Sequence, residues 1–352
     1  MLSMGLARAA IRQSINVQTF KKGPDYIDPL WLKAASYKPS FNLDPYLQSE
    51  GEISRTFEQH MAEMMLVEGT MGLHDGLAVD GQDCNAAVAK QLNLPVLLVI
   101  DCPGMHRTIA SLLNGIVDFD PYVEFSGLIL NRIRSGRHAS KIENAIQQYC
   151  SVPVLGVVPD SSEIEIEEQE LGLVPAPDFH LSNSYIDSVA DLLQSSCDLH
   201  SLFQPNRLRD NLPKRGRAER ETPITDLAPA KQFNVGIAQD EAFHFYYEDD
   251  LATLRSRGVN LVPFSPLKDA LPADLDALLI GGGFPERHAA ALADNKLCRD
   301  ALASAIEGGL PVRAECGGLM YLCQSIEMEN VVWPMVGCMV RVLVRWCVRD
   351  AQ

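Results

Sequence analysis

Apolar runs rich in β-branched residues recur through the first part of the chain, with helix-like patterns between them. The runs occupy residues 16–20, 64–69, 95–101, 125–133 and 152–159. Strands that are continuously apolar are buried on both faces, as in a parallel sheet covered by helices on both sides. The first residues, MLSMGLARAAIRQ, space basic and apolar side chains as a helix does and contain no cleavage signal. The pattern therefore predicts one α/β domain over residues 1–200.

The character of the chain changes at residues 201–232, which are polar, charged and rich in proline. Such a segment has no apolar face to bury and is interpreted as a linker. Alternation of strands and helices then restarts and predicts a second, flavodoxin-like α/β domain over 233–352. Its expected strands are 234–240, 259–266, 275–283 and 311–316, and its expected helices are 246–257, with His244 near the helix start, and 295–307.

Composition and charge exclude some classes of function. The 352 residues carry a formal net charge of −16, which argues against a general nucleic-acid or membrane-surface binder. The nine cysteines show neither paired nor metal-ligand spacing, so a reduced, cytoplasmic protein is expected. The apolar segment 331–350 is interrupted by three arginines and does not predict a membrane span.

Cys316 is the first candidate for chemistry. It lies in the sequence A-E-C-G-G, between an expected strand and an expected helix, with small residues two positions away on each side. This is the pattern of a nucleophile elbow, in which a tight turn presents the side chain at a helix N-terminus. The alternative is a buried core cysteine before a glycine turn. No histidine follows Cys316, because the last histidine of the chain is His288.

Glycines at the end of another expected strand strengthen the first interpretation. The sequence LLIGGGFPE places Gly281, Gly282 and Gly283 at the carboxyl edge of the second sheet. Sites in open α/β sheets form at that edge, and glycines allow backbone N–H groups to approach a developing oxyanion.

A second cluster lies in the first domain, in FKKGPDYIDP. Gly23 and Pro24 predict a turn that gathers Lys21, Asp25, Tyr26 and Asp28 at a strand end. A solvated charged loop would explain these residues equally well if they stood alone. In VEGTMGLHDG, however, Glu68 ends a buried strand and glycines lead on to Asp75. A carboxylate at such a strand end commonly holds the Mg²⁺ of a nucleotide.

Five motifs in this order resemble the cobyrinate a,c-diamide synthases and the similar hydrogenobyrinate enzymes. They are F-K-x-G-P-D-Y-I-D-P, E-G-x-M-G-L-x-D-G, E-L-G-L-V-P, G-G-G-F-P-E and A-E-C-G-G-L-M-Y-L. The resemblance covers residues 1–337. It implies a P-loop NTPase-like domain similar to dethiobiotin synthetase, joined to a class I glutaminase-like domain.

The resemblance also implies an activity. Family members use ATP to activate the a and c acetate carboxylates of cobyrinate or hydrogenobyrinate as acyl phosphates, which ammonia from glutamine then attacks. On this basis Cys316 is the expected nucleophile in the glutaminase domain. The backbone N–H groups of Gly282, Gly283 and Gly317 are the expected oxyanion donors.

In the synthetase domain the resemblance assigns roles to the charged cluster. Lys21 is expected to neutralise phosphate charge, and Asp28 and Glu68 to hold Mg²⁺. Asp25, Tyr26 and Asp75 are expected to line the substrate site. Asn131, at the end of a strand, is expected either to contact the adenine of ATP or to be a turn residue.

Both ends depart from the family pattern. No G-x-x-x-x-G-K-[ST] loop occurs in the sequence, and the resemblance ends near residue 338, before the family's histidine. The expectation is a chain truncated at both ends, lacking the first strand and phosphate loop, and at best weakly active as written.

Three alternatives stay open at this point. Nickel-sirohydrochlorin a,c-diamide synthase and cobyric acid synthase share the domain plan. A non-catalytic protein that binds a tetrapyrrole or a partner is the third, although such a protein would have no use for a nucleophile. The sequence also leaves open a homodimer.

Overall fold

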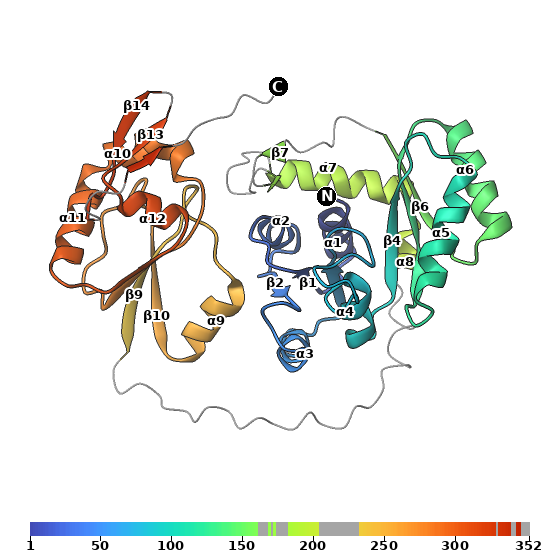
Figure 1. Ribbon diagram of the computed structural model, residues 1–352, viewed down its shortest axis with the longest axis horizontal. Helices are drawn as coiled ribbons and strands as arrows, with labels where there is room; N and C mark the ends of the chain where they lie inside the picture. The colour runs from blue at the N-terminus through green and yellow to red at the C-terminus, as the bar shows by residue number, and fades with distance from the viewer. Residues whose placement is uncertain are drawn as a thin grey trace. The chain divides into compact units, whose positions relative to one another are not determined.

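The computed structural model describes residues 1–160, 168–169, 172–173, 182–203, 232–328, 330–338 and 343–345. Most of the E-L-G-L-V-P motif, most of the expected linker and most of the chain after residue 338 lie outside the described residues. The chain divides into two compact units, Met1–Arg220 and Glu221–Gln352. Figure 1 shows strands and helices in both units, and each unit is described here by itself.

The first unit contains two parallel sheets of three strands each. One has the order β2-β1-β3 and the other the order β4-β5-β6, with every neighbouring pair parallel. The strands are β1 (Val17–Lys22), β2 (Phe41–Leu43), β3 (Met64–Glu68), β4 (Val96–Asp101), β5 (Phe125–Ile133) and β6 (Val154–Pro159). A short antiparallel pair, β7 (Glu168–Gln169) and β8 (Gly172–Leu173), lies apart from them. The predicted parallel α/β class is confirmed.

Helices bury the apolar faces of these sheets. Their bounds are α1 (Leu2–Arg12), α2 (Ile27–Ser36), α3 (Glu50–Gln59), α4 (Asn85–Leu92), α5 (Thr108–Phe119), α6 (Gly136–Tyr149), α7 (Ser182–Ser196) and α8 (Leu199–Leu202). Ile53 and Phe57 of α3 and Val88 of α4 share one core cluster with Phe20 of β1. Residues of α5 and α6 form another cluster with β4 and β5. Burial of this apolar area is the main force that holds the helices on the strands.

Helix α1 is joined to α2 and α7 by one buried arginine. The Arg8 side chain is 3% exposed and donates to the carbonyl oxygens of Ala34 and Ala35 at 2.8 and 3.0 Å. It also forms an ion pair with Asp187 of α7 at 2.7 Å. A buried guanidinium is tolerated because its donors are satisfied in this way.

The second unit has a parallel sheet of order β10-β9-β11-β12. Its strands are β9 (Phe233–Ala238), β10 (Val259–Phe264), β11 (Ala277–Ile280) and β12 (Val312–Ala314). The helices are α9 (Glu248–Ser256), α10 (Ala289–Asp294), α11 (Lys296–Glu307) and α12 (Gly317–Leu322), with a 3₁₀ turn, η4 (Pro285–His288). A smaller sheet joins β13 (Ser325–Met328), β14 (Val331–Pro334) and β15 (Leu343–Arg345).

The start of α9 differs from the sequence prediction. The helix was expected from residue 246 with His244 near its start, but it begins at Glu248. The backbone N–H groups of His244 and Phe245 instead donate to the carbonyl oxygen of Gly282, each at 3.1 Å. The prediction for His244 is wrong because a long-range backbone contact outweighs local helix propensity.

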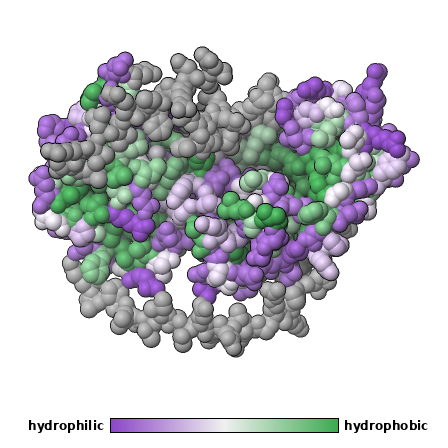
Figure 2. Space-filling model, viewed as in Figure 1, coloured by the Kyte–Doolittle hydropathy of each residue, from purple (hydrophilic) through white to green (hydrophobic). Residues whose placement is uncertain are grey.

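The surface is consistent with this layering. In Figure 2, hydrophilic residues gather over the outer helices at the right of the picture, and hydrophobic residues show further inward. Among the described residues, no helix has both the length and the apolar character needed to cross a bilayer.

Candidate active sites

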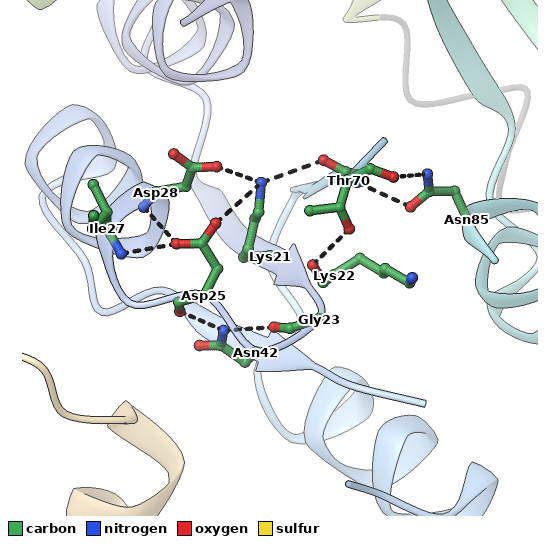
Figure 3. A network of polar contacts seen from close by, with 10 residues as sticks. Lys21, Lys22, Gly23, Asp25, Ile27, Asp28, Asn42, Thr70 and Asn85 are labelled. Atoms are coloured by element: carbon green, nitrogen blue, oxygen red, sulfur yellow. Dashed lines mark hydrogen bonds and ion pairs between the residues drawn. The ribbon is translucent and has the colours of Figure 1, made fainter. Parts of the chain in front are cut away.

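The first candidate site forms where β1 and β3 end. These strands are parallel and their register places Lys21 beside Glu68. The carboxyl ends of parallel strands share one sheet edge, so the side chains that follow them converge there. Sequence reasoning anticipated this convergence, and Figure 3 shows Lys21 surrounded by polar groups from the turn after β1 and the loop after β3.

A tight turn brings Asp25 and Asp28 back over the strand end. Gly23 has a φ of +87°, in the left-handed region that favours glycine. The side chain of Asn42 on β2 donates to the carbonyl oxygens of Gly23 and Asp25 at 2.9 and 2.8 Å. Asp25 accepts from the backbone N–H groups of Ile27 and Asp28 at 2.8 and 3.0 Å and so caps α2. The cap fixes Asp28 in the first turn of that helix.

Lys21 is 3% exposed and keeps its charge through these carboxylates. Its Nζ forms an ion pair with Asp28, lies 3.7 Å from an oxygen of Asp25, and donates to the carbonyl oxygen of Gly69 at 3.3 Å. Burial by itself would lower the pKa of Lys21, but Glu68, Asp28 and Asp25 outweigh it and raise that pKa. The cluster therefore holds one buried ammonium and three carboxyl groups.

Asp25 is the carboxyl group of this cluster whose negative charge is disfavoured by its surroundings. Burial, and next the negative charge of Asp28, raise the pKa of Asp25, while Lys21 and the capping N–H groups oppose the rise. Two carboxylates beside one ammonium leave excess negative charge, and a divalent cation would relieve it. The donor set thus fits Mg²⁺. The described residues contain no group of three His, Cys, Asp or Glu side chains arranged to hold a metal alone. Mg²⁺ does not require one, since it commonly takes one or two carboxylates together with water and phosphate oxygens.

Hydrogen bonds hold the loop after Glu68 beside the cluster. The Thr70 hydroxyl donates to the carbonyl oxygen of Lys22 at 3.1 Å. Asn85, at the start of α4, accepts from the Thr70 N–H at 3.1 Å and donates to the carbonyl oxygen of Gly72 at 3.0 Å. Figure 3 shows Thr70 and Asn85 facing each other across this loop. Asn42, Thr70 and Asn85 could not be recognised from the sequence, because a lone polar residue carries no local signal.

Three other predicted residues lie around or away from the cluster. Tyr26 immediately precedes α2 and is half-buried. Asp75 is exposed, accepts from the Gly72 N–H at 3.2 Å, and makes no ion pair or hydrogen bond with Lys21 or Asp28 in the described structure. Asn131 lies on β5 of the other sheet, aligned with Asp101 of β4, rather than in a turn. The structure therefore brings Lys21, Asp25, Asp28 and Glu68 together, and no polar contact joins Asp75 or Asn131 to them.

The second candidate site is the turn between β12 and α12. Cys316 is exposed at the apex of this turn and has a φ of +49° and a ψ of −113°, a conformation rarely adopted by side-chain-bearing residues. The Glu315 N–H donates to the carbonyl oxygen of Ile280 at 3.1 Å, and the Gly318 N–H donates to that of Gly281 at 2.9 Å. These bonds fix the turn against the glycines that follow β11.

The glycines permit this close approach. A Cβ on Gly318 would lie 2.2 Å from the carbonyl oxygen of Ile280, and one on Gly317 would lie 3.0 Å from that of Gly283. Gly283 has a φ of +152°, and a Cβ there would lie 2.0 Å from the carbonyl oxygen of Ala242. A Cβ on Gly282 would contact the Cβ of Cys316 at 3.4 Å. The thiol therefore lies directly beside the glycine run.

The N–H groups of Gly283 and Gly317 donate to no acceptor in the part of the chain that the structure describes. Free N–H groups beside a nucleophile are the donors that an acyl-transfer oxyanion requires. Tyr246 also contributes to this site, although the sequence did not indicate it. The Tyr246 hydroxyl accepts from the Gly281 N–H at 2.8 Å, a contact across 35 residues that has no local sequence signal.

Comparison with known families assigns a domain family to each unit. The family described as a CobB/CobQ-like glutamine amidotransferase domain matches residues 234–342, and the family described as an AAA domain matches residues 43–168. A glutaminase domain joined to a nucleotide-binding domain defines a glutamine-dependent amidating ligase.

Relatives narrow the class further. Proteins named cobyrinate a,c-diamide synthase from Listeria innocua and a Synechococcus species are 37% and 41% identical to the chain. These alignments cover 96% and 94% of the chain and 74% and 73% of the relatives. One from Salmonella typhimurium is 37% identical over 93% of the chain and 71% of that protein. The chain belongs to the cobyrinate a,c-diamide synthase family, glutamine-dependent ligases of cobalamin biosynthesis. The names of these relatives favour this hypothesis over the three alternatives.

A likeness to a solved structure is weaker. The MinD cell division protein of Aquifex aeolicus is 12% identical, with a TM-score of 0.33, and the match covers 55% of this chain and 90% of that one. A similarity this low carries no functional argument.

Proposed function

We propose that this chain uses ATP and Mg²⁺ to activate the a and c acetate carboxylates of cobyrinate or hydrogenobyrinate as acyl phosphates, which ammonia from glutamine converts to amides. The observation that carries the proposal is the cluster at the ends of β1 and β3, where buried Lys21 meets three carboxyl groups. This charge arrangement suits a site that holds phosphate and a cation together.

In the synthetase centre, Asp28 and Glu68 would hold Mg²⁺, which would neutralise phosphate charge when bound. Lys21 would shift its ammonium from Asp28 toward a phosphate oxygen. Asp25, with its raised pKa, would hold or receive a proton beside the reacting carboxylate. Tyr26 and Asp75 would line the substrate site and Asn131 would contact the adenine. These three assignments rest on the family resemblance.

In the glutaminase centre, Cys316 would attack the glutamine amide carbon to form a thioester and release ammonia. The N–H groups of Gly283 and Gly317, which donate to no protein acceptor among the described residues, support their role as oxyanion donors. The N–H group of Gly282 is proposed as a further oxyanion donor on the basis of the family resemblance. We also propose a cytoplasmic homodimer, to be tested by light scattering.

Two substitutions separate the half-reactions. Cys316→Ser should abolish glutamine-dependent amidation, followed by mass spectrometry of the corrinoid, and leave ammonia-dependent amidation intact. Glu68→Gln should abolish both, since it removes a charge from the synthetase centre. Cys338→Ser, which changes a half-buried thiol in the second unit, is the matched control and should retain both. Failure of ammonia to support Cys316→Ser, or full activity of Glu68→Gln, would contradict the assignments.

A further inference from the structure

Residues 242–246, which precede α9, make backbone hydrogen bonds to the glycine run, residues 281–283, and to Phe284 directly after it. The nucleophile turn, residues 315–318, bonds to Ile280 and Gly281 in the same way. The Gly282 carbonyl oxygen accepts from the N–H groups of both His244 and Phe245, and the Phe284 N–H donates to the carbonyl oxygen of Ala242 at 3.0 Å. Glycines 281–283 therefore lie between two flanking segments, with residues 242–246 on one side and residues 315–318 on the other. The position of the glycine N–H groups depends on both.

Tyr246 makes the side-chain contact in this arrangement. Its hydroxyl donates to the carbonyl oxygen of Ala238, at the end of β9, at 2.5 Å, and accepts from the Gly281 N–H at 2.8 Å. One hydroxyl thus joins two neighbouring strand ends. Burial raises the pKa of Tyr246, so the hydroxyl keeps the proton that it donates to Ala238.

The ring of Tyr246 lies against the glycine itself. A Cβ on Gly281 would come within 2.6 Å of Cε1 and 2.7 Å of Cζ of this ring. Ring packing and the hydrogen bond therefore act on the same peptide. The carbonyl oxygen of Gly281 accepts from the Gly318 N–H in the nucleophile turn at 2.9 Å. A shift at Gly281 would consequently be transmitted both to Gly283 and to the turn that carries Cys316.

We propose that Tyr246 is a positioning residue for the glutaminase centre. By fixing the Gly281 peptide, it sets the separation between the Cys316 sulfur and the Gly283 N–H, which would donate a hydrogen bond to the oxyanion. Its hydroxyl bonds to Ala238 and Gly281, and no hydrogen bond joins it to the Cys316 thiol among the described residues, so its effect would pass through Gly281. The inference rests on the proposed role of Cys316 as the nucleophile.

Tyr246→Phe removes the hydroxyl and keeps the ring. Displacement of a reacting group by about 1 Å can cost about a hundredfold in rate. We expect the kcat for glutamine hydrolysis to fall by about 10- to 100-fold, with the KM for glutamine changed by less than about twofold, because the loss acts on the transition state. Tyr321→Phe is the matched control. It removes another buried hydroxyl of the second unit, one that makes no hydrogen bond to residues 281–283 among the described residues, and should leave kcat unchanged.

A covalent readout distinguishes positioning from general damage. A diazoketone analogue of glutamine labels Cys316 only when the site places its carbonyl correctly, whereas iodoacetamide needs only an accessible thiolate. In folded Tyr246→Phe, labelling by the analogue should slow by about tenfold relative to wild type while labelling by iodoacetamide is unchanged. Unchanged labelling by both reagents, with Cys316 labelled in the wild type, would overturn the role of Tyr246. If the analogue fails to label wild-type Cys316, the nucleophile assignment fails and the inference falls with it.

Hydrogen exchange on the wild-type chain tests the geometry without a variant that could unfold. The Gly281 amide should exchange as slowly as the amides of β11, because Tyr246 protects it. The Gly283 amide, which has no acceptor among the described residues, should exchange much faster. Equal, fast exchange at both glycines would show that the Tyr246 bond does not form, and would overturn the inference even if Tyr246→Phe cannot be purified.

Discussion

Gly283→Ala tests how tightly the glycine run is packed. The new Cβ would lie 2.0 Å from the carbonyl oxygen of Ala242 and 3.1 Å from the Cα of Phe243, so backbone must move. The φ of +152° adds strain of about 1–3 kcal/mol for any residue with a Cβ. Moving Ala242 also weakens its bond from the Phe284 N–H, which is worth about 0.5–1.5 kcal/mol. The free energy of unfolding of the second unit should therefore fall by about 2–4 kcal/mol.

Gly309→Ala is the matched control for this variant. Gly309 also has a left-handed φ, of +94°, but a Cβ there would meet no heavy atom within 4 Å. Its cost should be limited to backbone strain of about 1–2 kcal/mol. The difference between the two variants isolates the clash with Ala242.

Urea unfolding followed by tryptophan fluorescence measures both variants, and Trp333 in β14 reports on the second unit. The midpoint for Gly283→Ala should lie below that for Gly309→Ala, with the same slope. Glutamine hydrolysis should fall at least about a hundredfold in Gly283→Ala alone, because the shift would displace the proposed oxyanion donor. Equal midpoints for the two variants would refute the close approach, and full glutaminase activity would refute the role of Gly283.

Three further predictions concern the first unit. Gly51→Ala, inside α3 with no heavy atom near the new Cβ, should raise the free energy of unfolding by about 0.5–1 kcal/mol, and a decrease in urea midpoint would contradict this. Ser49→Ala breaks the capping box of α3 and should lower the free energy of unfolding by about 1 kcal/mol. Bonds from the Ser49 N–H and hydroxyl lower the pKa of Glu52, so this stabilisation is present above the ordinary glutamate pKa and is lost as pH falls through the folded pKa. If the difference in Tm between wild type and Ser49→Ala grew as the pH fell, the capping box would be refuted. Asp25→Asn keeps the capping oxygen but removes a charge that burial and Asp28 disfavour, so the variant should have a higher Tm than wild type near neutral pH while losing amidation. Because the pKa of Asp25 is raised in the folded state, the wild-type protein loses stability as the pH rises through that pKa. The higher Tm of Asp25→Asn should therefore disappear in acid. A higher Tm for the variant at low pH alone would contradict the raised pKa.

Much of the fold followed from local pattern. Continuous apolar runs predicted the strands of the parallel sheets to within a few residues, with the exception of β2, whose three residues were not predicted as a strand. The runs are informative because sheet faces covered by helices are apolar. The start of α9 was misplaced because the N–H groups of His244 and Phe245 bond to Gly282, far away in the sequence. Local propensity cannot anticipate such a contact.

The candidate sites divide in the same way. Motif spacing and the family resemblance indicated Lys21, Asp28, Glu68, Cys316 and glycines 281–283 as candidate residues, since strand ends and tight turns require particular residue types. The strand register of β1 and β3 decided that Lys21 is buried among three carboxyl groups and that the pKa of Asp25 is raised. Tertiary packing alone selected Tyr246 from the tyrosines of the chain. Its partners, Ala238 and Gly281, belong to the ends of different strands, and only the folded sheet brings them within reach of one hydroxyl.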